Sequence, residues 1–192
     1  NPLPLAPAID LFVLGAAERL WPAVLDLVAA GTSRERLLEE LATREGYLVP
    51  AHHLDGGSTS GLRLRRLERH DHETAPSSAI PASWAVTPHT EYRGRGLVEM
   101  SRGCPEKCRY CWASYSSGRL RCYPTAGILD RVRELSRLTD RIGFVATAVG
   151  DHPDLAIILE ECLASGLQPS VSSLRIPAMR PEILRLLARA GA

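Results

Sequence analysis

The chain has 192 residues, enough for one or two domains and too few for a large multi-domain enzyme. Its 23 Lys and Arg residues nearly balance 22 Asp and Glu residues, which excludes a general polycation for nucleic acid and an acidic tail. A hydrophobic fraction of 45% excludes wholesale disorder, and the early apolar run at residues 11–17 is far shorter than the roughly 20 residues that cross a bilayer.

Residues 1–50 are predicted to belong to an α/β unit. Residues 9–14 are apolar except for Asp10 and are followed by Gly15, which is typical of a buried parallel strand. An apolar stripe predicts a helix over residues 20–28, and the capping sequence that begins at Thr32 predicts a second helix before a short strand at residues 47–50. Because one strand and two helices cannot bury their own faces, we expect the remnant of a larger, Rossmann-like domain.

Residues 51–95 are predicted to be a linker. The stretch at residues 56–61 is rich in Gly, Ser and Thr, and three prolines (Pro76, Pro81 and Pro88) interrupt any long element. The arginines between Arg63 and Arg69 could contact RNA phosphates, but such a run is more typical of a solvated face.

Strands and helices alternate regularly in residues 96–192. The predicted strands are residues 97–100, 142–149 and 170–174, and the predicted helices are residues 128–135, 155–163 and the segment from Pro181 onward. This order indicates a parallel sheet with helical crossovers. An eight-unit barrel needs about 250 residues, so the segment holds about three βα units of a partial (β/α) TIM-type barrel.

Three cysteines lie within eight residues, at Cys104, Cys108 and Cys111. Soft thiolate ligands favour zinc, copper(I) or an iron–sulfur cluster. Structural zinc and ordinary electron-transfer clusters take four protein ligands, whereas Cys122 and Cys162 stand alone in the sequence. Three ligands leave one coordination position open for a small molecule, and the odd total of five cysteines suits a reducing, cytoplasmic location.

Two other interpretations of the cysteines remain open at this point. Positions i, i+4 and i+7 would also place three small buried side chains on one face of a core helix. The same thiols could instead bind zinc. Gly103 and Pro105 favour a loop over a helix, and charged residues occupy the intervening positions.

The spacing of the three cysteines, with Tyr110 before the last one, resembles the signature of the radical S-adenosylmethionine (SAM) enzymes. Residues 97–105 look like the first barrel strand of the branch related to methylthiotransferases and the elongator catalytic subunit. The resemblance implies that Cys104, Cys108 and Cys111 bind three irons of a 4Fe–4S cluster. SAM would chelate the fourth iron, and its reductive cleavage would give a 5′-deoxyadenosyl radical.

The resemblance also implies a set of SAM-binding residues. Tyr110 would lie against the adenine. Gly150 and Asp151 replace a Gly-Gly-Glu-like turn that binds the methionine amine, although they could equally belong to a helix cap at His152 and Pro153. Ser173 and Arg175 could hold the methionine carboxylate; the alternative, that Arg175 pairs with an acid in a neighbouring loop, is favoured.

The predicted function is therefore that of a radical SAM enzyme, with methyl or methylthio transfer as candidate reactions. The alternatives are an iron–sulfur electron carrier, with Cys122 as the fourth ligand, and a zinc-stabilised interaction module. An electron donor such as a flavodoxin or ferredoxin is an implied partner; the substrate is undetermined, nucleic acid being one option, and no membrane is expected. Residues 1–50 resemble the end of a cobalamin-binding domain, which makes cobalamin a further candidate cofactor. The Asp-x-His-x-x-Gly ligand pattern is absent from these residues and would have to lie before Asn1. On its own, the 192-residue chain is expected to be an inactive fragment of a barrel that aggregates through its exposed strand edges.

Overall fold

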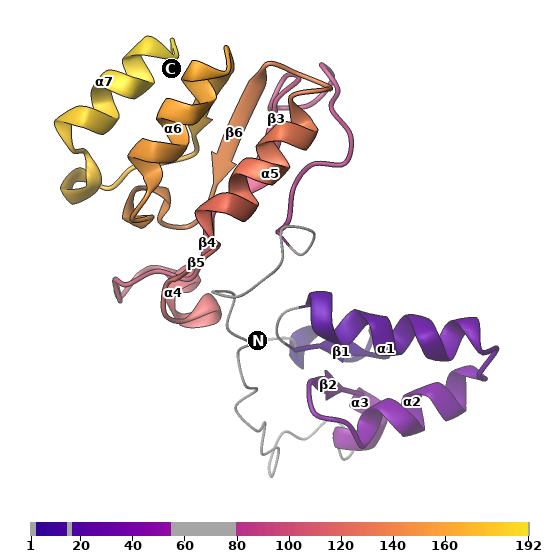
Figure 1. The fold of residues 1–192 in the computed structure, drawn as a ribbon. Coiled ribbons are helices and arrows are strands. Elements are labelled where there is room, and N and C mark those ends of the chain that lie inside the picture. The colour runs from indigo at the N-terminus through magenta and orange to yellow at the C-terminus, as the bar shows by residue number, and fades with distance from the viewer. Residues whose placement is uncertain (1–2, 15–16, 55–79, 192) are drawn as a thin grey trace. The chain divides into compact units, whose positions relative to one another are not determined.

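The computed structural model describes residues 3–14, 17–54 and 80–191 (Figure 1). The chain divides into two compact units, residues 1–70 and 71–192, which are described separately. The division falls within the predicted linker. The Gly/Ser-rich stretch and the arginines from Arg63 to Arg69 lie outside the described residues.

The first unit is built around two helices. These are α1 (Ala17–Ala29) and α2 (Arg34–Ala42), and the Ser33 hydroxyl caps α2 by accepting a hydrogen bond from the amide of Arg36. The helices pack with the short strands β1 (Phe12–Val13) and β2 (Tyr47–Leu48), followed by α3 (Pro50–His53). The core of this unit consists of Val24, Leu37, Leu38, Leu41, Tyr47 and Val49.

The prediction of a parallel strand at residues 9–14 is wrong. Only Phe12 and Val13 form a strand, and they pair antiparallel with Leu48 and Tyr47. Because α1 and α2 are joined by a short connection and pack together, the chain returns in the opposite direction beside β1. The two predicted helices and the short strand at residues 47–48 are present.

The second unit contains a three-stranded parallel sheet in the order β3 (Gly96–Glu99), β6 (Arg141–Val145), β7 (Gln168–Val171). The connecting helices are α5 (Thr125–Leu135) and α6 (Leu155–Ala164), and α7 (Pro181–Arg189) follows β7. Helix α5 packs against β3 and α6 against β7, while α6 also contacts α5 and α7 (Figure 1). This alternation confirms the predicted α/β class and the parallel sheet.

The two faces of the sheet differ. Val98 and Met100 are fully buried in the hydrophobic core with residues of α5, α6 and α7. Leu97 and Glu99, which point to the opposite face by strand alternation, are only partly buried. Helices therefore cover one face of the sheet, and the other face is free to line a cavity.

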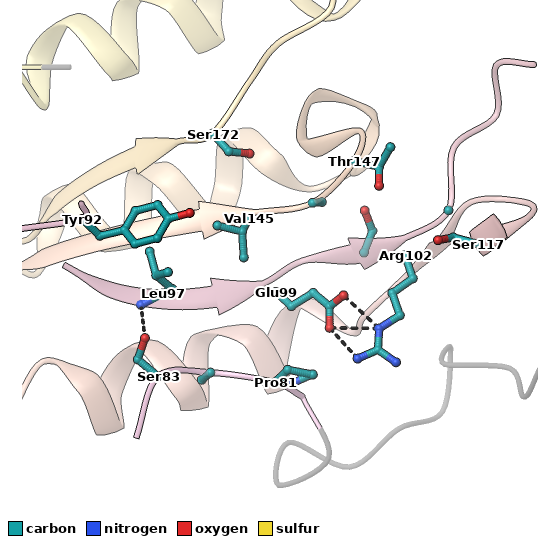
Figure 2. A pocket seen from close by; sticks show the side chains of 14 residues that line it. Pro81, Ser83, Tyr92, Leu97, Glu99, Arg102, Ser117, Val145, Thr147 and Ser172 are labelled. Atoms are coloured by element: carbon teal, nitrogen blue, oxygen red, sulfur yellow. Dashed lines mark hydrogen bonds and ion pairs between the residues drawn. The ribbon is translucent and has the colours of Figure 1, made fainter. Parts of the chain in front are cut away.

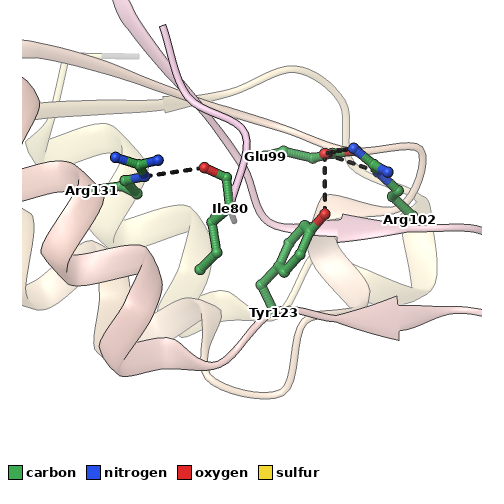
Figure 3. A network of polar contacts seen from close by, with 5 residues as sticks. All are labelled: Ile80, Glu99, Arg102, Tyr123 and Arg131. Carbon is green, nitrogen blue, oxygen red and sulfur yellow. Dashed lines mark hydrogen bonds and ion pairs between the residues drawn. The ribbon is translucent and has the colours of Figure 1, made fainter. Parts of the chain in front are cut away.

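The end of the predicted linker packs on the edge of β3. The Ser83 amide donates to the Leu97 carbonyl at 2.8 Å, and the Glu99 amide donates to the Pro81 carbonyl at 2.9 Å. Ile80 is fully buried, and its carbonyl accepts a hydrogen bond from Arg131 Nε of α5 at 3.1 Å (Figure 3). Residues 80–83 thus satisfy the backbone groups of an edge strand that would otherwise be exposed.

A small hairpin not predicted from the sequence follows β3. Strand β4 (Ser101–Arg102) pairs antiparallel with β5 (Arg121–Cys122), and the chain between them carries the three cysteines and helix α4 (Trp112–Ser117). Gly103 begins this excursion with a φ of +80°. A Cβ atom on Gly103 would lie 2.1 Å from the Arg119 carbonyl oxygen, so only glycine fits there.

His152 is buried rather than exposed, contrary to what its loop position suggests. Its side chain is 2% exposed, and Nε2 lies 3.0 Å from the Tyr123 carbonyl oxygen. Nδ1 accepts the Asp154 amide just before α6, which leaves Nε2 to carry the proton and donate. Burial lowers the pKa of His152, because the charged imidazolium loses its hydration.

Among the helices that the structure describes, none has the length and apolar character that crossing a membrane requires.

We expect Gly103→Ala to lower the free energy of unfolding by at least about 2 kcal/mol, because both the left-handed backbone and the clash with Arg119 must be accommodated. Gly166→Ala is the matched control, since Gly166 has a φ of +73° but open space around it, and should cost only about 1 kcal/mol. Urea unfolding followed by circular dichroism measures both losses. Equal losses would show that the approach of Arg119 does not constrain Gly103.

The stability of the second unit should decrease as the pH falls below about 6.5, the ordinary pKa of histidine. The unfolded chain then takes up a proton that the folded His152, with its lowered pKa, resists. His152→Gln should flatten this dependence even if it lowers stability overall, because the residue that resists protonation in the folded state is then absent. An unaltered pH slope in His152→Gln, measured by urea unfolding between pH 5.5 and about 7.5, would contradict the assignment.

Candidate functional site

The three cysteines lie in a non-helical segment, residues 104–111, which we call the cysteine loop. Cys104 is buried, and Cys108 and Cys111 are half-buried. The Cys104 amide donates to the Gly118 carbonyl at 3.1 Å, and the Cys111 amide donates to the Cys108 carbonyl at 3.0 Å. The absence of helix across this described segment overturns the alternative of three cysteines on one face of a core helix.

The donor set of the cysteine loop suits a soft metal centre. All three thiols are free, and the amides of Ser114 and Ala113 at the start of α4 lower the pKa of Cys111 by favouring its thiolate, the form that binds metals. In residues 3–14, 17–54 and 80–191, no three His, Cys, Asp or Glu side chains are grouped as around a single ion. A cluster has a different requirement, because each thiolate binds its own iron.

The other two cysteines have different surroundings. Cys162 is buried in α6, and burial raises the pKa of its thiol to about 12, so it stays a neutral core side chain. Cys122 lies in β5, opposite Ser101 of β4. Its position in a paired strand contrasts with the loop position of the three clustered cysteines.

Arg175, after β7, forms ion pairs with two other segments, at Asp151 after β6 and at Glu106 in the cysteine loop. Its Nη1 lies 2.9 Å from Glu106 Oε1 in the cysteine loop. Its Nε and Nη2 bind the two carboxylate oxygens of Asp151, with 3.1 Å between Nε and Oδ2. Arg175 therefore pairs with loop acids, as the favoured alternative predicts, and the hydrogen bond to Asp151 raises its pKa.

The remaining predicted SAM-binding residues lie in the segments after β6 and β7 and in the cysteine loop. Gly150 belongs to a short 3₁₀ turn, η3 (Val149–Asp151), and a Cβ there would lie 2.4 Å from the Ala178 Cβ atom. Ser173 is exposed just after β7. Tyr110 is 92% exposed in the cysteine loop, so its ring is available to a ligand.

A cavity of about 810 Å³ opens on the face of the sheet that the helices leave uncovered (Figure 2). Its wall combines residues of β3 and the end of β6 with residues 81–83 and with residues 101–103, which precede the cysteine loop. The lining residues are Pro81, Ala82, Ser83, Tyr92, Leu97, Glu99, Ser101, Arg102, Gly103, Ser117, Val145, Ala146, Thr147 and Ser172. Several of these residues carry hydroxyl groups, and the charged Glu99 and Arg102 pair with each other, so the cavity is suited to a polar ligand.

An ion pair at the cavity wall was not predicted from the sequence. Arg102 Nε lies 2.8 Å from Glu99 Oε1, and Arg102 Nη2 lies 2.8 Å from Glu99 Oε2 (Figure 2). The Tyr123 hydroxyl also reaches Glu99 Oε2, at 3.5 Å (Figure 3). The signal available in the sequence was strand alternation, which places Leu97 and Glu99 on the face opposite Val98 and Met100.

Comparison with known proteins agrees with this geometry. Residues 98–192 match the family model of the radical SAM superfamily. The mitochondrial tRNA methylthiotransferase CDK5RAP1 of Rattus norvegicus is 29% identical over 128 residues, which cover 65% of this chain and 19% of that protein. The ribosomal protein uS12 methylthiotransferase RimO of Desulfotalea psychrophila is 27% identical over 104 residues, or 49% of this chain and 24% of that protein.

An uncharacterized protein of Methanocaldococcus jannaschii, MJ0966, is 28% identical over 93 residues, or 47% of this chain and 21% of that protein. The chain thus spans about a fifth of the length of the curated relatives it matches. In each case the similarity is to part of a longer protein. Through residues 98–192, the chain belongs to the radical SAM superfamily and is similar to its methylthiotransferase branch.

Proposed function

We propose that this chain is part of a radical SAM enzyme and that residues 96–192 form about three βα units of its (β/α) barrel. The observation that carries the proposal is the placement of three free thiols in one loop beside the carboxyl ends of β3, β6 and β7. In parallel α/β folds, ligands bind beyond these strand ends. The coverage of only one face of the sheet by helices is what a segment of barrel requires, since a barrel has an inner face.

Cys104, Cys108 and Cys111 are the proposed ligands of a 4Fe–4S cluster, and SAM would occupy the coordination position that three thiolates leave open. If bound there, the cluster would supply one electron to the sulfonium of SAM, which would break the S–C5′ bond and give methionine and a 5′-deoxyadenosyl radical. The residues around the cysteines would keep the ligand thiols in place and favour their thiolate form. The amides at the start of α4 do this for Cys111 by favouring its charged form.

For SAM itself, the proposed contacts are Tyr110, Gly150 and Ser173. The other two residues that the resemblance implies, Asp151 and Arg175, pair with each other. The groups that stay available to a ligand are therefore the exposed Tyr110 ring, the backbone around Gly150 and the exposed Ser173 hydroxyl. The nearby hydroxyl-lined cavity would then take the substrate.

The wider activity is proposed from the relatives. Two of them are named as methylthiotransferases, one for tRNA and one for a ribosomal protein, so methylthio or methyl transfer to such a macromolecule is the proposed reaction class. A flavodoxin or ferredoxin is the proposed electron donor, and the free thiols suit a reducing, cytoplasmic location. Cobalamin is left out of the proposal, because nothing in the names of these relatives points to it.

Anaerobic reconstitution of the chain with iron and sulfide tests the ligand assignment. Replacing Cys104, Cys108 or Cys111 by Ser should abolish cluster formation, measured as bound iron and visible absorbance, because a single missing thiolate leaves two irons of the cubane without protein ligands. Cys122→Ser is the matched control and should retain the cluster. Loss of iron in Cys122→Ser would instead indicate a four-cysteine electron carrier.

The EPR spectrum of the reduced, reconstituted protein tests the open coordination position. Addition of SAM should shift the spectrum, because the ligand binds directly to an iron that no cysteine holds. A spectrum that is indifferent to SAM would contradict the enzyme proposal and favour an electron carrier. Failure to take up iron, together with stoichiometric zinc binding, would favour a zinc-stabilised module.

A further inference from the structure

The segments that follow the three parallel strands are joined by one guanidinium group. Arg175, after β7, contacts Asp151 of η3, which follows β6, and Glu106 of the cysteine loop, which follows the β3–β4 segment. Glu106 and Arg175 are 69 residues apart in sequence. We propose that Arg175 is a positioning residue, which fastens the cysteine loop to the carboxyl end of the sheet through Glu106 while Asp151 orients its guanidinium.

The cysteine loop needs such an attachment. Pro105, Glu106, Lys107, Arg109 and Tyr110 are all exposed, so burial of apolar surface does little to fix the loop. Its backbone–backbone hydrogen bonds are those of the Cys104 and Cys111 amides, and between them the Lys107 carbonyl accepts one from the Tyr115 hydroxyl at 3.4 Å. The ion pair at Glu106 acts between these two cysteines, on the segment that joins Cys104 to Cys108.

Arg175 is well held for this task. Its backbone carbonyl accepts the Ala178 amide at 2.9 Å, at the start of the 3₁₀ turn η4 (Ile176–Ala178). Gly150 lies so close to Ala178 that a Cβ atom would clash, so η3 and η4 are interlocked. Asp151 and Arg175 are thereby kept opposite each other, and their two-point contact fixes the plane of the guanidinium before it meets Glu106.

The charge of Arg175 also acts on the loop. Its ion pair with Glu106, which is two residues from Cys104, brings the guanidinium charge close to the ligand segment of the loop. A permanent positive charge near a ligand sulfur favours the more reduced state of a bound cluster. This second consequence rests on the proposed function, whereas the attachment of the loop does not.

Alkylation of the metal-free chain by iodoacetamide, followed by mass spectrometry, measures how freely the loop opens. Glu106→Gln and Arg175→Gln should each raise the alkylation rate of Cys108 about two- to fivefold, as expected for loss of a partly exposed ion pair. Arg175→Lys keeps the charge but loses the two-point fork, and should give an intermediate rate. In the unaltered chain, about 1 M salt should raise the rate, while Glu106→Gln should not respond.

The matched control is Arg180→Gln, which removes the same charge from a nearby exposed ion pair with Glu182. It should leave the Cys108 rate unchanged, and Cys122 serves as an internal reference thiol in every variant. Since Glu106 is half-exposed at the surface, Glu106→Gln will not unfold the protein. Equal Cys108 rates in the unaltered chain and Glu106→Gln would overturn the proposal.

The midpoint potential of the reconstituted cluster, followed by EPR, distinguishes the electrostatic effect of Arg175 on the cluster from its role in holding the loop. Arg175→Gln should lower the potential because a positive charge is lost, and Glu106→Gln should raise it because a negative charge is lost, although both variants loosen the loop. Shifts of the same sign would overturn the electrostatic part. If the chain bound no cluster but the alkylation rates changed as expected, the proposed function would fail while the attachment by Arg175 would stand.

Discussion

Parallel pairing of β3, β6 and β7 is the constraint on which the site depends, because it brings three strand ends to one edge of the sheet. Hydrophobic burial against α5, α6 and α7 drives this arrangement, with Val98, Ile142 and Phe144 fully removed from water. The segments after the strands must then lie near one another, however far apart they are in sequence. The contacts of Arg175 with Asp151 and Glu106 are a direct result.

Helices cover only one face of the sheet, and the cavity lies on the other face. An ordinary doubly wound sheet has helices on both faces, and its strands are apolar throughout. Here β3 alternates, with Val98 buried under the helices and Glu99 on the opposite face beside Arg102. Glu99 is neutralised by Arg102 and hydrogen-bonded by Tyr123, which makes a carboxylate tolerable in a partly buried wall.

The cysteine loop depends on local geometry as well as on the sheet. Gly103 lets the chain leave β4 where the Arg119 carbonyl approaches, and the β4–β5 pairing closes the excursion that contains the loop. Within this frame, exposed charged residues separate the thiols, so few apolar contacts hold them. Ion pairs and amide hydrogen bonds, each of modest strength, therefore carry more of the positioning than they would in a buried core.

The sequence by itself determined the alternation of strands and helices in residues 96–192 and the clustering of three thiols at Cys104, Cys108 and Cys111, because periodicity and cysteine spacing are local properties of the chain. It also identified Arg175 as a partner for a loop acid, without naming Glu106 or Asp151. It failed for β1, whose direction depends on how α1 and α2 pack. It did not address the burial of His152, which depends on the Tyr123 carbonyl. Only the tertiary structure decided the β4–β5 hairpin, the cavity beside Glu99 and the three-way contact of Arg175, since each joins residues that are separated in the chain and meet only when the sheet has formed.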